Sequence, residues 1–366
     1  MGDRLPRSLT LAAILGLVHA IVDASTVTVV FSVAGIHAVP AAAAAALVVG
    51  YDVIAFAGQP FLGILADKLG NMRQVIIVGL LLTSASLGLM FVSPLAACIA
   101  AGVGNALFHL GAGAVCIQIE RGRAAPTGIF VGPGVIGLAL GIWFGKSGMV
   151  LIWPFALALC VALLIAAFVA LPQTHRLADA TAGVVSRQIA RPWLGLALLM
   201  SSIFLRSLVG HAGMQACPKL PQVLFGIAGA ACLGKMLGGI VADRLGWIRT
   251  STIALVVALP FIAFGDGNPY LVGIGMCFFQ STMAVTLIAI AMIFPKYPAF
   301  AFGLNCLAFV LGALPTFYPP LSAWYGAASF SVVIGLSIAT VACGLWTVRA
   351  SPSPCPSGRD RLLRMP

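Results

Sequence analysis

Four charged residues lie inside long apolar stretches of the sequence: Asp23, Asp52, Arg206 and Lys235. A charge at the centre of a bilayer costs about 2.5–3.5 kcal/mol on insertion scales, so such residues normally face an internal cavity and find partners there. Two acids and two bases carry no net charge together, which suits ion pairs or a site whose partners change during a working cycle. The chemistry that they indicate is the binding and release of ions or polar molecules.

Helical spacing places two histidines beside other polar groups. His19 and Asp23 are four residues apart, as are Asn105 and His109, so each pair shares one face of its helix. A carboxylate beside a histidine, away from water, can exchange a proton near neutral pH. We predict that Asp23 with His19 carries protons. A purely structural contact between helices is the alternative, and Asp52 could carry the proton instead.

The two cations inside apolar stretches have two interpretations. Arg206 and Lys235 could bind an anionic group of a substrate, or they could only neutralise the two acids. Uncharged polar residues on the same stretches would line the cavity beside them. The predicted substrate-binding residues are Tyr51, Gln59, Asn105, His109, Arg206 and Lys235.

The elements that must position these residues are membrane-spanning helices. Of the 366 residues 61% are hydrophobic and only 8% are charged, whereas a soluble domain carries roughly 25% charged residues. A bilayer core needs about 20 apolar residues per helix. We predict an all-α integral membrane protein with helices at 8–34, 41–65, 75–92, 95–117, 127–145, 149–171, 192–214, 220–242, 250–264, 270–294, 299–320 and 327–348.

The longest polar connection divides these helices into two sets of six. We predict an N-terminal bundle at 1–172, a cytoplasmic linker at 173–191, a C-terminal bundle at 192–349 and a disordered Ser/Pro-rich tail at 350–366. Most Lys and Arg residues fall on the side of both termini, and only Lys146 and Lys219 fall in loops on the other side. The positive-inside rule then predicts that both termini are cytoplasmic. The membrane that we expect is a bacterial-type inner (plasma) membrane.

Two copies of one sequence pattern support a division into related halves. Residues 58–73 read GQPFLGILADKLGNMR, and residues 234–249 read GKMLGGIVADRLGWIR. An Asp at the C-terminal end of a helix is disfavoured by the helix dipole, so it needs an Arg or the N-terminus of the next helix as partner. Such a charge latch could hold one face shut. The predicted gating residues are Gly63, Asp67, Lys68, Gly70 and Arg73, with Gly239, Asp243, Arg244, Gly246 and Arg249.

The repeat also makes a prediction about the cavity. Gln59 corresponds to Lys235, so the two should face each other across a pseudo-two-fold axis, and Gln59 should share a helix face with Asp52, seven residues earlier. The alternative for the repeat itself is a routine basic loop. Finding the pattern twice, after the second helix of each half, favours the latch.

The repeated pattern resembles the signature loop of the major facilitator superfamily of transporters, which is built from two parallel six-helix repeats. The sequence Gly128-x-x-x-Gly132-Pro133, followed by Gly137, resembles the glycine-proline motif of proton-linked exporters in that superfamily. The resemblance implies the major facilitator fold, with twelve transmembrane helices in two pseudo-symmetric six-helix bundles that work by alternating access.

Three further motifs resemble the fosmidomycin-resistance subfamily of exporters. They are His19-x-x-x-Asp23, the Tyr51…Gln59-Pro60 helix and the Phe108-His109 turn. The sequence departs from that pattern at Asp52, where an uncharged residue is typical, and at Leu110, where proline is. The resemblance implies proton-driven export of a small compound, anionic in one interpretation. An uptake symporter for an organic anion or other nutrient is the alternative.

Other classes of function find little support. The net charge of +11 is spread over short loops instead of forming a nucleic-acid patch. The sequence contains no metal-ligand cluster, no G-x-S-x-G and no P-loop. We therefore expect no enzyme, no metal, no cofactor and no nucleic acid, and a monomer whose partners are a small-molecule substrate, protons and the lipid bilayer. A non-transporting membrane sensor is the remaining alternative.

Overall fold

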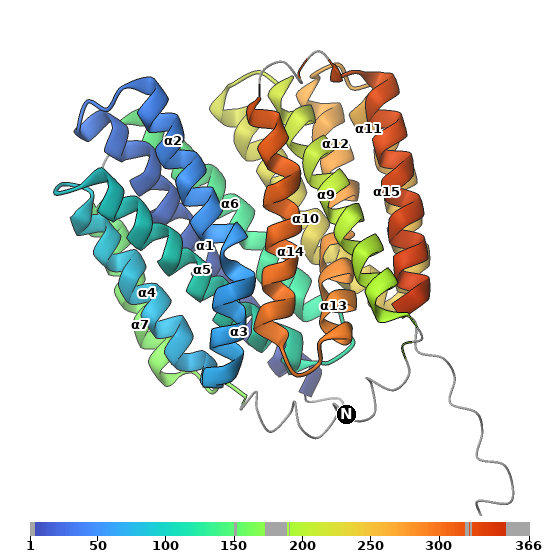
Figure 1. Cartoon of the computed structure of the whole chain (residues 1–366), viewed down its shortest axis with the longest axis horizontal. Helices are drawn as coiled ribbons and strands as arrows, with labels where there is room; N and C mark the ends of the chain where they lie inside the picture. The colour runs from blue at the N-terminus through green and yellow to red at the C-terminus, as the bar shows by residue number, and fades with distance from the viewer. Residues whose placement is uncertain are drawn as a thin grey trace, which may run out of the picture.

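The computed structural model describes residues 4–149, 152–172, 189, 191–318, 322 and 324–348, and every regular element among them is a helix (Figure 1). The predicted tail at 350–366 and nearly all of the predicted linker at 173–191 lie outside the described residues. The first half contains α1 (Arg4–Ile36), α2 (Ala41–Asp52), the π-helix η1 (Val53–Ala57), α3 (Gln59–Leu69), α4 (Met72–Leu89), α5 (Pro94–Ile119), α6 (Ala125–Ser147) and α7 (Ile152–Phe168).

The second half repeats this arrangement. It contains α9 (Pro192–Gln215), α10 (Pro221–Leu245), α11 (Trp247–Ala263), α12 (Pro269–Gln280), α13 (Met283–Ile293), α14 (Pro298–Ala313), the 3₁₀-helix η2 (Leu314–Phe317) and α15 (Ala327–Val348). Ten helical segments among the described residues are long and apolar enough to cross a membrane, and the shorter apolar helices α7 and α11 complete twelve. Each predicted span overlaps one of these twelve.

Local sequence signals explain where several helices begin and end. Ser93 and Asn268 cap the N-termini of α5 and α12 through their side-chain oxygens, and a proline follows each cap. Gly70 ends α3 at φ 69°, and Gly246 ends α10 at φ 94°. These backbone angles strain any residue with a Cβ, so the glycines at the end of both repeat copies are needed for the turn.

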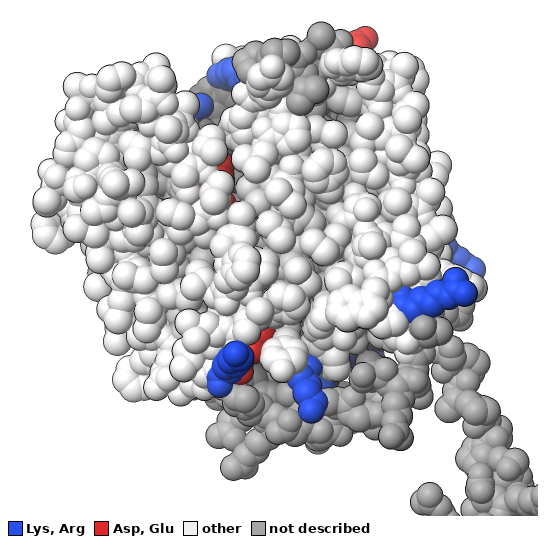
Figure 2. All heavy atoms as spheres, in the orientation of Figure 1, with Lys and Arg blue, Asp and Glu red and all other residues white. Residues whose placement is uncertain are grey.

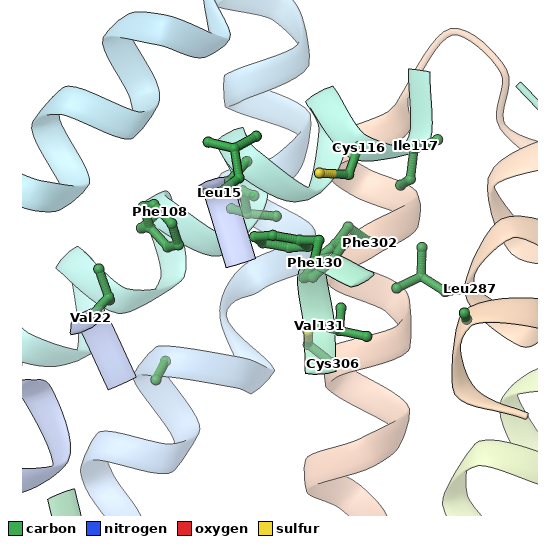
Figure 3. Packing of buried hydrophobic residues seen from close by; sticks show 14 of the residues in the cluster. Leu15, Val22, Phe108, Cys116, Ile117, Phe130, Val131, Leu287, Phe302 and Cys306 are labelled. Atoms are coloured by element: carbon green, nitrogen blue, oxygen red, sulfur yellow. The ribbon is translucent and has the colours of Figure 1, made fainter. Parts of the chain in front are cut away.

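The helices form two groups, which Figure 1 shows side by side. The halves meet where α6 packs on α10 and where α14 packs on α3, η1 and α5. Figure 3 shows Phe130 of α6 beside Phe302 of α14, so the apolar core continues across the junction. The first and last described helices, α1 and α15, have their free ends on the same side of the molecule (Figure 1), as an even number of crossings requires.

The outer surface suits a lipid environment. Large apolar side chains such as Trp153, Phe168 and Trp346 are exposed, which a water-facing surface of this extent would not tolerate. Figure 2 shows a face that is nearly free of charge in its middle, with Lys and Arg mainly towards its lower edge. Acidic atoms are visible in the crease between the two lobes (Figure 2).

Candidate functional site

A buried cluster surrounds Asp23 in the first half. His19 Nε2 lies 3.1 Å from Asp23 Oδ2, and Asn105 Nδ2 donates a hydrogen bond to Asp23 Oδ1 at 2.8 Å. His109 Nε2 lies 3.7 Å from the same Oδ1. The two pairs predicted from helical spacing therefore meet, one from α1 and one from α5. Both histidines are 5% exposed, so the cluster is shielded from bulk water.

The backbone orients both imidazoles in the same way. His19 Nδ1 lies 3.0 Å from the carbonyl oxygen of Phe130, and His109 Nδ1 lies 2.8 Å from that of Asn105. A carbonyl only accepts hydrogen bonds, so each Nδ1 carries a hydrogen, and each Nε2 faces the carboxylate. Two Nε2 lone pairs beside a carboxylate would repel it. The arrangement is stable when a proton, or another cation, is shared among the three side chains.

The sequence contains no metal-ligand motif, but the structure places three potential metal ligands close together. One potential ligand atom from each of His19, Asp23 and His109 lies within 4.8 Å of the others. No metal-ligand motif exists along the chain because α5 is distant from α1 in sequence. The tertiary structure nevertheless brings together a set whose spacing could fit a cation larger than a proton.

Two hydroxyl groups, those of Thr26 and Tyr51, extend the hydrogen-bond network of the cluster. Thr26 Oγ1 lies 3.0 Å from the hydroxyl of Tyr51 and accepts a hydrogen bond from Asn105 Nδ2 at 3.3 Å. Tyr51, predicted as a substrate-binding residue, is buried at 3% exposure. It is connected to the cluster through its hydrogen bond with Thr26. Sequence reasoning missed Thr26, although its position three residues after Asp23 on one helix was a usable signal.

Lys235 of α10 faces this cluster from the second half. It interacts electrostatically with Asp23 and with His109. However, no carboxylate oxygen of the described residues lies within 4.0 Å of its Nζ atom, the distance that defines an ion pair. Its ammonium group also forms no hydrogen bond with any of the described residues. Lys235 is therefore a cation near Asp23 without a direct partner.

Gln59 and Asp52 are not arranged as the repeat suggested. Gln59 is fully buried, its Nε2 donates to the Ala55 carbonyl at 2.7 Å, and no hydrogen bond joins it to Lys235. Asp52 is half-buried and has no hydrogen-bond or ion-pair partner among the described residues. The expected common face is wrong because the π-helix η1 lies between them: its wider turn shifts the register, so seven residues no longer equal two α-helical turns.

Arg206 lies apart from the acids, inside the second half. Its guanidinium donates to the hydroxyl of Thr286 at 3.0 Å, to the hydroxyl of Thr282, and to the carbonyl of Ser202 at 3.3 Å. No described acid pairs with it, so the interpretation that Arg206 neutralises Asp23 or Asp52 is not supported. The two threonines, Thr282 at the N-cap of α13 and Thr286 inside that helix, are functional candidates that sequence reasoning missed.

The two repeated aspartates form matching contacts between the halves. Asp67 Oδ1 and Oδ2 accept hydrogen bonds from the backbone N–H groups of Ala299 (3.0 Å) and Phe300 (2.9 Å) at the start of α14. Asp243 accepts from Ala124 (2.8 Å) and Ala125 (2.9 Å) at the start of α6. The predicted helix N-terminus is thus the partner, but it belongs to the opposite half and not to the next helix.

Glycines make this close approach possible. A Cβ at Gly63 would lie 2.8 Å from the Ala299 carbonyl oxygen, and one at Gly239 would lie 2.6 Å from that of Ala124. Arg73 donates instead within its own half, to the carbonyls of Ala166, Ala167 and Val169 at the end of α7. The remaining basic residues of the pattern, Lys68, Arg244 and Arg249, are exposed.

The glycine-proline motif of α6 serves two neighbours at once. A Cβ at Gly128 would lie 2.5 Å from the Lys235 carbonyl oxygen, and one at Gly132 would lie 2.5 Å from the Met236 side chain, both on α10. A Cβ at Gly137 would collide with the Ala20 carbonyl of α1. Pro133 interrupts the helix interior between these contacts. The motif therefore holds α6 against both α1 and the second half.

An aromatic series crosses between the halves next to His109. Ring centroids are 6.1 Å apart for His109 and Phe56, 6.5 Å for Phe56 and Phe309, and 5.2 Å for Phe309 and His211. Phe56 belongs to η1 in the first half, and Phe309 to α14 in the second. Isolated phenylalanines in apolar helices carry no sequence signal of such a role.

Comparisons with known proteins bear on the fold. No protein-family model and no curated protein matches this sequence. Among solved structures, the E. coli fucose:proton symporter FucP is similar, with a TM-score of 0.67 at 14% identity, covering 94% of this chain and 98% of the symporter. The human organic anion transporter MFSD10 is similar with a TM-score of 0.64 at 15% identity, covering 94% of this chain and 99% of the transporter.

The proton:xylose symporter XylE gives a TM-score of 0.65 at 15% identity, covering 93% of this chain and 94% of the symporter. The likeness extends over nearly the whole length of each protein. With the helices and the contacts between halves described above, it shows that this chain has the major facilitator fold, an all-α membrane architecture of two pseudo-symmetric six-helix bundles, as the sequence predicted.

Proposed function

We propose that this chain is a secondary active transporter that moves a small molecule across a membrane by alternating access, coupled to protons. The observation that carries the proposal is the buried carboxylate of Asp23 between the Nε2 atoms of His19 and His109. Each Nδ1 is held by a backbone carbonyl, so the cluster can accept and release a proton without rearranging its rings. Asp23 is the carrier, and His19, His109 and Asn105 are its partners.

The alternating step follows from the two latches. Asp67 and Asp243 each join one half to a helix N-terminus of the other, at the same end of the molecule. Breaking both would let the halves rock apart at that end. We assign this end to the cytoplasm from the positive-inside rule, which makes the present state outward-facing, with both termini cytoplasmic in a bacterial-type plasma membrane and the chain acting as a monomer.

The direction of transport has two candidates. The resemblance to the fosmidomycin-resistance exporters favours export in exchange for protons. Two of the solved structures with this fold are proton symporters, which supports uptake together with protons. Vesicles with an imposed inside-acid or inside-alkaline gradient separate the two by the direction in which substrate moves.

The experiment that tests the proton site begins with a thermal-shift screen of purified protein across phosphonates, organic acids and antibiotics. A stabilising compound is then used for flux measurements in proteoliposomes. Asp23→Asn should abolish flux driven by a pH gradient because an amide carries no proton at these pH values, whereas Asp266→Asn, at an exposed turn, should leave it unchanged.

Two further arms identify the cation and the residue. A chelator should not alter wild-type flux if the shared cation is a proton. Asp52→Asn should retain coupling, since Asp52 has no described partner that could relay a proton. Undiminished pH-driven flux in Asp23→Asn, or loss of coupling only in Asp52→Asn, would rule out the assignment to Asp23.

A further inference from the structure

Lys235 lies near Asp23 but forms no direct contact with its carboxylate within ion-pair distance. Asp23 is the acid with which Lys235 interacts electrostatically. The two carboxylate oxygens of Asp23 already contact His19, Asn105 and His109. The ammonium group has three donors, and none of them forms a hydrogen bond with a described residue. A cation withdrawn from bulk water gains from an anionic partner, so a negatively charged group of a ligand would be favoured beside Lys235.

The position of Lys235 between the halves is fixed by backbone packing. Its carbonyl oxygen lies against Gly128 of α6, so this turn of α10 cannot move away from the first half without losing that contact. Cys306 of α14 interacts electrostatically with both Lys235 and Asp23. The lysine, the aspartate and α14 therefore meet at the junction of the two halves, where a transported molecule would have to pass.

The groups around Asp23 come from five helices. They are His19 from α1, Tyr51 from α2, Asn105 and His109 from α5, Lys235 from α10 and Cys306 from α14. Lys235 is the one basic amine among them, and none of the side-chain hydrogen bonds of the described residues involves it. The charge state of Asp23 and any ion bound to Lys235 must therefore influence each other directly.

We propose that Lys235 binds the anionic group of the transported molecule, and that this anion and the proton on the Asp23 cluster bind cooperatively. The inference rests on the proposed function. An anion at Lys235 neutralises the ammonium that otherwise stabilises the Asp23 carboxylate, and adds a negative charge nearby, so it favours the protonated cluster. By reciprocity, a protonated cluster frees Lys235 to bind the anion.

The sign of this linkage decides the mode of transport for an anion. Cooperative binding carries the proton and the anion in the same direction, which is symport. Exchange requires competition, which this geometry would give to a cationic substrate that binds at Asp23. The rings of Phe56 and Phe309 continue from His109 across the junction of the halves. Aromatic rings favour flat apolar partners, so the inferred substrate class is an organic anion with a flat apolar body.

The test uses benzenesulfonate as the probe, because it stays a single anion at both mildly acidic and mildly alkaline pH. Its neutral isostere, benzenesulfonamide, and a cation of similar shape, benzylammonium, are the comparison ligands. Affinities are measured by calorimetry on the purified full chain at the two pH values. The wild type should bind benzenesulfonate roughly fivefold or more tightly at acidic pH, within the usual range of coupling between sites, and should take up protons as it binds.

Three variants sharpen the result. Lys235→Gln should lose benzenesulfonate binding, whereas Lys219→Gln should not, because Lys219 is an exposed lysine bonded to the carbonyls of Met214 and Gln215. Asp23→Asn, which is permanently neutral, should bind the anion at the tighter level at both pH values. That last result separates this inference from the proton site: flux can fail in Asp23→Asn while anion binding persists.

Several outcomes would overturn the inference. Binding that is weaker at acidic pH, or equal at both, would show competition or independence in place of cooperativity. Equal binding of the sulfonamide, preferential binding of benzylammonium, or no binding of benzenesulfonate by the wild type would remove the anion site at Lys235. None of these results would decide whether Asp23 carries the proton, because that role is tested separately by the flux measurements on Asp23→Asn.

Discussion

Replacing both Asp67 and Asp243 with asparagine should open the end of the molecule that these residues hold closed. Each carboxylate accepts two backbone N–H groups at a helix N-terminus in the opposite half, at 2.8–3.0 Å. An asparagine keeps one acceptor oxygen but turns its NH₂ group towards the other N–H, so each substitution removes about one charge-assisted hydrogen bond and the favourable interaction of a negative charge with the helix dipole.

The magnitude follows from these two losses. A hydrogen bond to a charged group contributes about 1.5–3 kcal/mol, and the helix dipole about 0.3–1 kcal/mol. Taking about 2 kcal/mol for each latch, one substitution shifts the ratio of closed to open ends roughly 30-fold, since about 1.4 kcal/mol is tenfold. The latches lie on different helices and share no residue, so their effects should add, giving nearly three orders of magnitude for the double variant.

Pulsed electron–electron resonance can measure this shift directly. Spin labels at Lys68 and Lys296, both exposed at the latched end, report the separation of α3 from the loop before α14 in a background without other reactive cysteines. We expect one short distance in the wild type, a mixture in either single variant and a predominantly long distance in the double variant. Asp266→Asn, at the exposed turn between α11 and α12, is the matched control. A double variant with the wild-type distance distribution would refute the latch.

Two further substitutions test the packing around the site. Gly137→Leu should sharply reduce the yield of folded protein, because its Cβ would collide with the Ala20 carbonyl, and overpacking costs about 1–3 kcal/mol or more. Gly35→Leu, where a Cβ meets nothing within 4 Å, is the control. Equal yields of the two variants would contradict the tight packing of α6 on α1. Arg206→Met should leave the melting temperature unchanged or raised, because replacing a buried charge by an apolar side chain of similar size is often neutral or stabilising. In this variant Thr286 keeps its hydrogen bonds to the carbonyls of Thr282 and Met283. A melting temperature several degrees lower would instead indicate that Arg206 organises the second half.

Short-range spacing was a reliable guide where one helix carried the whole signal. His19 with Asp23, and Asn105 with His109, share helix faces because four residues make about one α-helical turn. The same reasoning failed between Asp52 and Gln59, since η1 inserts a π-helical turn that no residue type in Val53–Ala57 announces. Spacing rules hold only while the backbone keeps one periodicity.

Pairing across the halves could not be read from the chain. The repeat indicated that Asp67 and Asp243 need partners, but the partners proved to be helix N-termini far away in sequence. Arg206 offered two interpretations from its charge alone, and its contacts with Thr282 and Thr286 favour neither acid. Which side chains meet depends on helix rotation and tilt, and these are set by packing of the whole bundle.

Composition and hydropathy alone predicted the membrane class and the twelve spans, because the need of a bilayer for long apolar helices acts on every segment separately. The repeated pattern at 58–73 and 234–249 predicted the two related halves. The tertiary structure alone decided that both histidines present Nε2 to one carboxylate, that Lys235 approaches it without a partner, and that the repeated aspartates join opposite halves. Those relations join segments distant along the chain, and only close packing of helices brings them within reach of one another.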